Sequence, residues 1–181
     1  MCHKGYGATS MNDIAEAAGL TKAGIYHYIH GKEHLLFEIM MYAMDRVEQG
    51  IIAPAREAAD AEERLRTIVE RHTRSVLEGV GAVTIVLEEM TALTPAHRKV
   101  ITARKRAYFD FIRGTLDQLA AEGKLRDVSS TTAAFSLLGM ILWICRWYRR
   151  DGKITPQQAV RDYVEIAMNG VLRTETKSSK H

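Results

Sequence analysis

Two arginines and two tryptophans lie close together at the end of a long apolar stretch, in Trp143 and the run Arg146-Trp147-Tyr148-Arg149. At helical spacing Trp143 and Trp147 share a face, and Arg146 lies near Arg149. A cation beside such an apolar helix is costly unless it is paired or faces a polar ligand. Because a guanidinium suits a carboxylate or a phosphate, the pattern predicts that this segment binds an anionic group. For the tryptophans, packing or a subunit contact is the alternative.

The remainder of the expected ligand site is mostly aliphatic. We place it in a cavity lined by the helices that hold Leu87, Met90, Tyr108, Ile112, Leu138 and Leu142. Such a lining suits a ligand with a sizeable apolar part. The basic group around Arg104 is expected to be mainly solvated surface, although an anionic ligand can recruit Arg104 or Lys105. The predicted ligand-binding residues are Arg146, Trp147, Arg149, Trp143, Arg104, Tyr108, Met90 and Leu142.

The acidic and histidine residues form no pattern typical of catalysis or metal binding. Glu88 and Glu89 are adjacent, and adjacent helical residues point about 100° apart, so the two carboxylates do not easily share one substrate atom. His30 and His34 have the spacing of metal ligands, but no thiol or carboxylate set completes a site. His72 lies on an apolar face and is expected to be a core histidine. We therefore predict no enzyme, no catalytic residue, no metal site and no cofactor.

Two short helices joined by a tight turn are predicted near the N-terminus. Ser10 and Asp13 have the spacing of a capping box, in which hydroxyl and carboxylate each bind a free backbone amide. Apolar residues then recur at helical spacing until Gly19, a typical left-handed stop. Thr21 can cap the second helix at once. This is the geometry of a helix-turn-helix, with a structural helical hairpin as the alternative.

The rest of the chain is also predicted to be helical, since no run alternates like a strand. A long helix from Lys32 is expected to stop at Pro54, and the later helices are expected over residues 65–76, 83–93, 94–123, 129–148 and 156–172. The helices over residues 129–148 and 156–172 have more apolar surface than packing within one subunit would bury. They predict a symmetric homodimer held by a four-helix bundle. The fold class is therefore all-α.

Composition agrees with one soluble globular chain. It has 181 residues, 46% of them hydrophobic and 26% charged, and Lys plus Arg exceed Asp plus Glu by three. That balance is too weak for nonspecific coating of nucleic acid. Cys2 and Cys145 form neither a disulfide framework nor a zinc motif, which favours a reducing cytoplasm. The apolar run from Ala133 to Cys145 is too short to cross a membrane, so we expect no membrane association.

The segment from Gly5 to Ile29, continued by Gly31-Lys32-Glu33-His34-Leu35-Leu36, resembles the DNA-binding signature of the TetR family of transcriptional repressors. The family's first helix normally precedes the position of Gly5, and only Met1 to Lys4 stand there, so we expect that helix to be largely missing. Hydroxyls at helix N-termini and lysines suit phosphates, and a glycine permits close approach to the groove. The resemblance implies DNA contacts by Ser10, Thr21, Lys22, Gly24, Tyr26, His27 and Lys32.

The resemblance also implies which part of the chain binds DNA and which part binds the ligand and forms the dimer. Residues 1–46 are expected to form the helix-turn-helix domain and connector helix, residues 47–173 the ligand-binding and dimerisation domain, and residues 174–181 a disordered tail. The run Arg146-Trp147-Tyr148-Arg149 is similar to regulators of lipid and steroid breakdown that respond to acyl-coenzyme A thioesters. An acyl-coenzyme A has the expected apolar body and anionic handle, although a free fatty or steroid acid satisfies the residue chemistry equally well.

These expectations give a ligand-responsive repressor that binds a double-stranded DNA operator as a homodimer. A small effector would act by shifting the spacing of the two recognition helices. The alternative is a ligand-binding dimer that lacks DNA binding because its first helix is absent.

Overall fold

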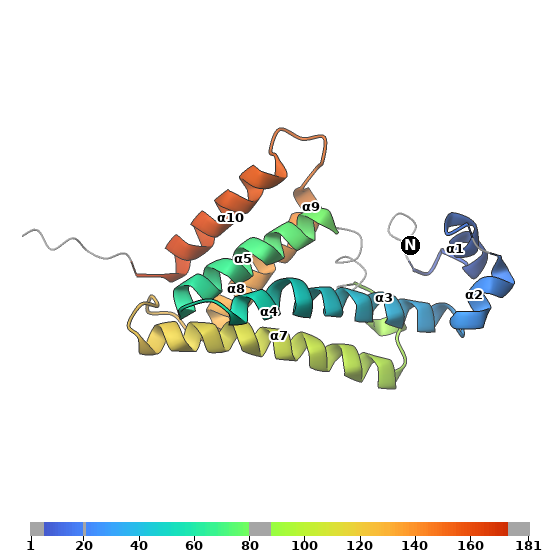
Figure 1. Ribbon diagram of the computed structural model, residues 1–181, viewed down its shortest axis with the longest axis horizontal. Helices are drawn as coiled ribbons and strands as arrows, with labels where there is room; N and C mark the ends of the chain where they lie inside the picture. Colours follow the sequence, from blue (N-terminus) through green and yellow to red (C-terminus); the bar gives the residue numbers. More distant parts are fainter. Residues whose placement is uncertain (1–5, 20, 80–87, 174–181) are drawn as a thin grey trace, which may run out of the picture. The chain divides into compact units, whose positions relative to one another are not determined.

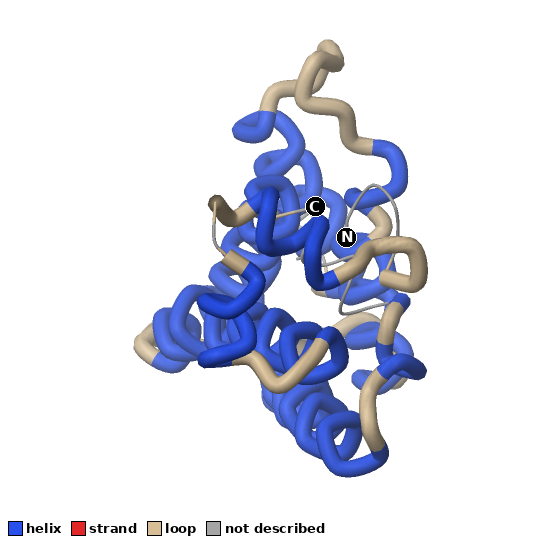
Figure 2. The backbone as a smooth tube through the Cα atoms, turned by 90° about the vertical axis from the view of Figure 1, so that its right-hand side faces the viewer, coloured by secondary structure: helices blue, strands red, loops and turns tan. Residues whose placement is uncertain are grey.

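The computed structural model describes residues 6–19, 21–79 and 88–173, and it describes only the backbone of Lys22, Ile25 and Tyr28 (Figure 1). Within these ranges the chain is helical and has no strand, as the tube in Figure 2 shows. An isolated antiparallel bridge joins Leu125 to Leu172. The predicted all-α class is confirmed. None of the described helices has the length and apolarity to cross a membrane.

The chain forms two compact units that interleave along the sequence. Unit 1 comprises Met1–Arg46 and Gly79–Arg106, and unit 2 comprises Val47–Glu78 and Ala107–His181. The helix α7 (Pro95–Ala121) contributes residues to both units. The expected tail 174–181 lies outside the described residues, as do Leu87 and most of the expected helix 83–93. The end of that stretch is a short 3₁₀ helix, η2 (Met90–Ala92).

Unit 1 begins with the predicted pair of short helices, α1 (Met11–Ala17) and α2 (Lys22–Tyr28). The capping box is complete: the Asp13 amide donates to Ser10 Oγ at 3.1 Å, and the Ser10 amide donates to Asp13 Oδ2 at 2.7 Å. Gly19 follows α1 with φ of 65°, a left-handed conformation that favours glycine. Met11 and Ala15 are buried in the core under this turn, with Ile14, Ile29 and Leu35 packed against them.

The next helix, α3 (Lys32–Val47), continues further than its sequence predicts. A π-helical turn, η1 (Glu48–Ile52), leads from α3 directly into α4 (Ala53–Arg56), so the expected stop at Pro54 is wrong. Pro54 is in the first turn of α4, where proline is tolerated. It cannot donate to the Gly50 carbonyl four residues earlier. That carbonyl instead accepts a hydrogen bond from Arg71 Nη1 at 3.4 Å.

Unit 2 is assembled around α5 (Ala61–Glu78). The helix α10 (Pro156–Val171) packs along it, and α8 (Ser130–Leu142), α4 and α9 (Ile144–Trp147) also contact it (Figure 1). The predicted caps are confirmed, since the Gln158 amide donates to Thr155 Oγ1 at 3.1 Å before α10 and Gly123 has φ of 71° after α7. The core is aliphatic, and its most buried side chains include Leu65, Ile68, Val69, Leu116, Leu119, Ile141 and Ile144.

One predicted helix is divided in two. The expected helix over residues 129–148 breaks at Trp143 into α8 and α9. The thiol of Cys145 donates to the Leu142 carbonyl at 3.0 Å. The Arg146 amide, which an unbroken helix would pair with Leu142, donates instead to the Trp143 carbonyl at 2.9 Å. This local tightening changes the direction of the residues that follow.

Candidate functional site

The helix α2 presents the residues that are predicted to read DNA. Tyr26 is 43% exposed, and His27 is also exposed. Thr21 Oγ1 accepts the Gly24 amide at 3.1 Å, and a Cβ added at Gly24 would lie 3.2 Å from that oxygen. Ser10 is occupied in capping α1. Thr21, Gly24 and Ser10 therefore have structural roles beside the predicted contacts with DNA.

Lys32, another predicted DNA contact, is at the start of α3 and binds the segment before α1. Its ammonium donates to the Gly7 carbonyl at 3.2 Å and lies 4.2 Å from the centroid of the Tyr6 ring. The Tyr6 amide in turn donates to Glu89 Oε1 at 3.2 Å. An ammonium has three donors, so two remain for another partner. Lys32 is partly buried rather than fully solvated.

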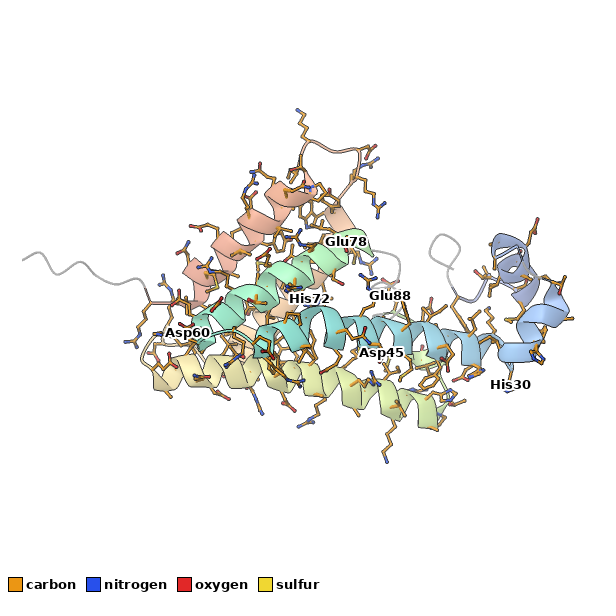
Figure 3. The ribbon with its side chains drawn as sticks, viewed as in Figure 1. His30, Asp45, Asp60, His72, Glu78 and Glu88 are labelled. Carbon is orange, nitrogen blue, oxygen red and sulfur yellow. The ribbon has the colours of Figure 1, made fainter. Side chains whose placement is uncertain are left out.

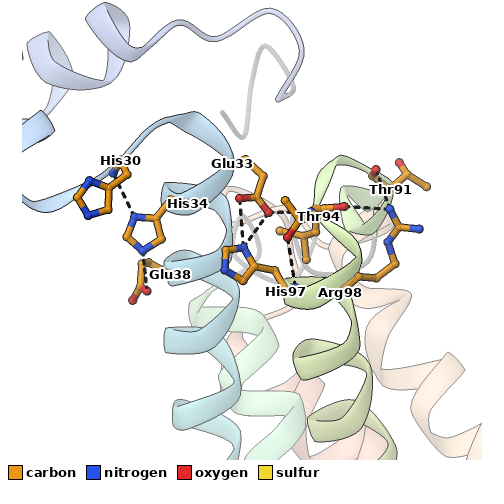
Figure 4. Close-up of polar contacts among 9 residues, drawn as sticks. His30, Glu33, His34, Glu38, Thr91, Thr94, His97 and Arg98 are labelled. Carbon is orange, nitrogen blue, oxygen red and sulfur yellow. Dashed lines mark hydrogen bonds and ion pairs between the residues drawn. The ribbon is translucent and has the colours of Figure 1, made fainter.

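A second polar contact within unit 1 joins α3 to the N-terminus of α7 (Figure 4). Glu33 Oε1 accepts the Thr94 amide at 2.8 Å and lies 2.9 Å from His97 Nδ1. The Phe37 ring stacks on His97 with 3.9 Å between centroids. Burial raises the pKa of Glu33, but the Thr94 amide and His97 outweigh it and lower this pKa below 4.5. The sequence analysis missed this contact, because its members are more than sixty residues apart.

The other histidine pair of unit 1 is engaged in local contacts. The His30 amide donates to His34 Nδ1 at 3.2 Å, the two rings stack 5.4 Å apart, and His34 Nε2 lies 3.4 Å from Glu38 Oε1. Among the described residues no group of three or more metal-ligating side chains comes together.

Tyr108, a predicted ligand contact, is paired inside unit 2. Its hydroxyl lies 3.0 Å from His72 Nδ1, and both side chains are buried (Figure 3 labels His72 on α5). Burial lowers the pKa of His72 to about 4 and raises that of Tyr108. His72 is therefore neutral at pH 7 and is a core histidine, as expected. The neighbouring hydroxyl of Thr73 is buried without a hydrogen-bond partner in the part of the chain that the structure describes.

Two predicted ligand residues, Arg104 and Met90, belong to unit 1. Arg104 Nη1 forms a short ion pair with Asp45 Oδ1. Met90 packs against the core cluster of Leu36, Met40, Leu93 and Ile101. The structure therefore assigns these two residues to a different compact unit from Tyr108 and Leu142.

The predicted ligand residues around α9 are distributed over its surface. Trp143 is 64% exposed, whereas Trp147 Nε1 donates to the Tyr163 hydroxyl at 3.2 Å. Leu142 is partly buried and Arg146 is exposed. The guanidinium of Arg149 lies 3.5 Å from Asp151 Oδ1, and both side chains are largely exposed.

A cavity of about 410 Å³ lies beside this segment in unit 2. Its lining residues come from the end of α5, the loop after α9 and the start of α10, and they are Arg74, Leu77, Glu78, Tyr148, Arg150, Pro156, Gln157 and Val160. Arg150 Nη2 donates to the Glu78 carbonyl at 3.1 Å, at the last residue of α5. Arg150 is in this lining and the predicted ligand residue Arg149 is not. Both follow the end of the predicted helix, where helical periodicity carries no information on side-chain direction.

Comparison with known proteins agrees with this architecture of a helix-turn-helix followed by an all-helical domain. Residues 1–39 match the family described as bacterial regulatory proteins, tetR family, and residues 58–171 match the Tetracyclin repressor-like C-terminal domain. The transcriptional repressor KstR2 of Rhodococcus jostii is 25% identical over 170 residues, covering 93% of this chain and 83% of KstR2.

Two solved structures are similar over nearly the whole chain. AibR in complex with isovaleryl coenzyme A and operator DNA is 41% identical, with a TM-score of 0.84 and coverage of 91% of this chain and 90% of AibR. The TetR family regulator PfmR from Thermus thermophilus is 32% identical, with a TM-score of 0.80 and coverage of 92% and 91%.

A helix-turn-helix followed by an all-helical C-terminal region is the architecture of a bacterial transcriptional regulator. The chain belongs to the TetR family of bacterial transcriptional regulators. It is accordingly a transcriptional regulator and not an enzyme, which confirms that prediction.

The contact between Glu33 and α7 predicts a pH-dependent contribution to stability. Glu33→Gln is expected to lower the free energy of unfolding at pH 7 by about 1 kcal/mol, because the charged acceptor of the Thr94 amide is lost. A carboxyl with a lowered folded pKa stabilises fully above its ordinary value of 4.5, and this contribution is lost as the pH falls through the folded pKa. The difference between parent and variant should therefore shrink below pH 4.5, as measured by urea unfolding.

The matched control is Glu38→Gln on the same helix. Glu38 is half exposed and pairs only with His34 at 3.4 Å in the contacts above. Exposed pairs contribute little, so its replacement should leave the unfolding curve nearly unchanged. Equal losses in the two variants at pH 7 would contradict the role of Glu33.

Proposed function

We propose that the chain is a homodimeric transcriptional repressor whose affinity for operator DNA is changed by an acyl-coenzyme A thioester. The observation that carries this proposal is the 41% identity to AibR, whose solved complex contains isovaleryl coenzyme A and operator DNA. Residues 1–46 would supply DNA binding, and residues 47–173 effector binding and dimerisation. A repressor of this kind acts on chromosomal DNA, so a cytoplasmic location belongs to the proposal.

The DNA-binding part of the proposal rests on α2 as the recognition helix. Tyr26 and His27 are exposed on it, and Lys22 stands at its first position, near the groove in a helix-turn-helix. Ser10, Thr21 and Gly24 lie at or near helix starts, where backbone amides and hydroxyls suit phosphates. The two donors of Lys32 not used by Gly7 are available to a phosphate.

We expect binding to a near-palindromic duplex with half-sites about one helical turn apart. Tyr26→Ala should weaken binding to the preferred sequence about tenfold or more and change the sequence preference, because a base contact is lost. Lys32→Gln should weaken all sequences about equally if it touches phosphate. Selection from a randomised duplex library, followed by titration at two salt concentrations, measures both effects.

Tyr42→Ala is the matched control for Tyr26, since Tyr42 is 62% exposed on α3 and outside the predicted contact set. Binding by this variant should equal that of the parent. A chain that binds effector but prefers no DNA sequence would overturn the repressor assignment and favour the alternative of a ligand-binding dimer.

Exposed apolar side chains on α8 and α10 support the proposed dimer. Phe135 is 63% exposed on α8, Trp143 is 64% exposed directly after α8, and Ile166 is 59% exposed on α10. Small residues stand beside them, with Gly139 exposed on α8 and Gly170 exposed on α10. Large apolar groups next to small ones favour close packing of helices from two subunits.

The parent is expected to be a dimer at micromolar concentration in light scattering and sedimentation. Ile166→Glu should raise the dissociation constant about a hundredfold, because an unpaired carboxylate would be buried in the bundle. Ile154→Glu is the control, because Ile154 is also exposed but lies in the loop before α10. A monomeric parent, or equal effects of the two variants, would contradict the proposed bundle.

The effector part of the proposal rests on the apolar interior of unit 2 and the cations at its edge. Tyr108 and Leu142 would contact the acyl group, and the buried Thr73 hydroxyl is available to a polar atom of the ligand. Arg146 is proposed as the principal anionic anchor, with Arg149, Trp143 and Trp147 beside it in unit 2. Arg104 and Met90 belong to unit 1, where Arg104 pairs with Asp45 and Met90 packs on the core cluster, so they are not part of this proposed set.

Calorimetry should detect binding of isovaleryl coenzyme A and much weaker binding of free isovalerate. Arg146→Ala should weaken the thioester about tenfold or more, as loss of a charge-assisted hydrogen bond does. Arg161→Ala removes an exposed cation from α10 and should bind like the parent. If neither ligand class binds, including longer acyl chains and their coenzyme A esters, the thioester assignment fails.

A further inference from the structure

The cavity next to α9 has the chemistry of a binding site for a phosphorylated nucleoside. Arg74 reaches it from α5 and Arg150 from the loop after α9. Glu78 is the carboxylate of this lining, and Glu70, which is not among the lining residues, pairs with Arg74 at 2.8 Å. Two guanidinium groups from separate elements around one hollow are suited to a phosphate group.

Both arginines keep donors available after their contacts with the protein. Arg74 Nη2 donates to Glu70 Oε1 at 2.8 Å, and Arg150 Nη2 donates to the Glu78 carbonyl at 3.1 Å. A guanidinium has five N–H donors, so each of these contacts orients a side chain without exhausting it. The two side chains are also exposed, which gives a charged ligand access from solvent.

The other lining residues supply aromatic, aliphatic and hydrogen-bonding groups that a phosphate ion alone would not need. Tyr148 offers an aromatic ring, Leu77 and Val160 offer aliphatic surface, and Gln157 offers an amide. Glu78 contributes a carboxylate, which accepts hydrogen bonds from hydroxyl or amino groups and repels a bare anion. A nucleoside phosphate meets each of these needs, with its base, its ribose hydroxyl and its phosphate. The volume of about 410 Å³ is within the range of small-molecule sites.

We infer that this cavity binds the phosphorylated nucleoside end of the effector. This inference rests on the proposed function, in which the effector is an acyl-coenzyme A. Coenzyme A carries its charge in two places, a diphosphate and a ribose phosphate, so Arg146 and the pair Arg74 and Arg150 hold different groups. Tyr148, which lines the cavity, is two residues after Arg146 in the sequence, so the chain that carries the proposed anchor continues into the lining.

The test is calorimetry on the full chain with three probes. These are isovaleryl coenzyme A, isovaleryl-pantetheine, which lacks the phosphates and nucleoside, and adenosine 3′,5′-bisphosphate, which lacks the acyl part. Arg150→Gln and Arg74→Gln should each weaken isovaleryl coenzyme A about tenfold and leave isovaleryl-pantetheine unchanged. Lys153→Gln removes the same charge from the same loop outside the cavity and should change neither.

The inference is overturned if the arginine variants weaken both thioesters equally, weaken neither, or behave like Lys153→Gln. It is also overturned if the parent binds isovaleryl coenzyme A and isovaleryl-pantetheine with the same affinity. Failure of the proposed function is a different result, in which the parent binds neither thioester. The bisphosphate then decides: binding that Arg150→Gln abolishes supports a nucleotide site in this cavity, and no binding overturns it.

Discussion

The need to bury one wide apolar face of α5 organises unit 2. Its apolar residues, among them Leu65, Ile68 and Val76, are almost wholly inaccessible to solvent. This apolar face of α5 is too wide for one neighbouring helix to cover. The helices α4, α8, α9 and α10 therefore all pack against α5. The strongest packing partner, α10, is the last helix of the described chain, and the core is therefore complete only when the C-terminal helix is in place.

The polar residues of α5 take their roles from that packing. Arg71 binds the Gly50 carbonyl that Pro54 cannot pair with, and His72 meets Tyr108 of α7. One turn further, Arg74 enters the lining of the cavity, and the Glu78 carbonyl at the helix end receives Arg150. A single helix thus supports the core with one set of side chains and presents charge and hydrogen bonds with another. Because α5 has both roles, a ligand bound in the cavity would contact a helix that also forms the core of unit 2.

Unit 1 combines polar contacts at helix ends with two core clusters. Among the helix-turn-helix side chains that the structure describes, Met11 and Ala15 are buried in one core cluster. Lys32 and Glu33 at the start of α3 bind the Gly7 carbonyl and the Thr94 amide respectively, and a second cluster around Leu36 and Met40 lies below them. These contacts join the start of α3 to the segment before α1 and to the start of α7 within unit 1.

The sequence by itself determined the helices whose ends are capped locally. Ser10 with Asp13, Gly19, and Thr155 before α10 act within three or four residues, so their hydrogen bonds and backbone angles follow from near neighbours. The same local information located the helix-turn-helix and its exposed Tyr26. It failed at Pro54, where the Gly50 carbonyl that proline cannot pair with binds Arg71 instead. It also failed at Trp143, where the Leu142 carbonyl accepts a hydrogen bond from the Cys145 thiol instead of from the Arg146 amide. Only the tertiary structure decided that Glu33 meets His97, that Tyr108 meets His72, and that Arg150 rather than its neighbour lines the cavity. These partners are separated by 36 to 72 residues, and their meeting depends on how each helix is rotated against the next, which no periodicity within one helix specifies.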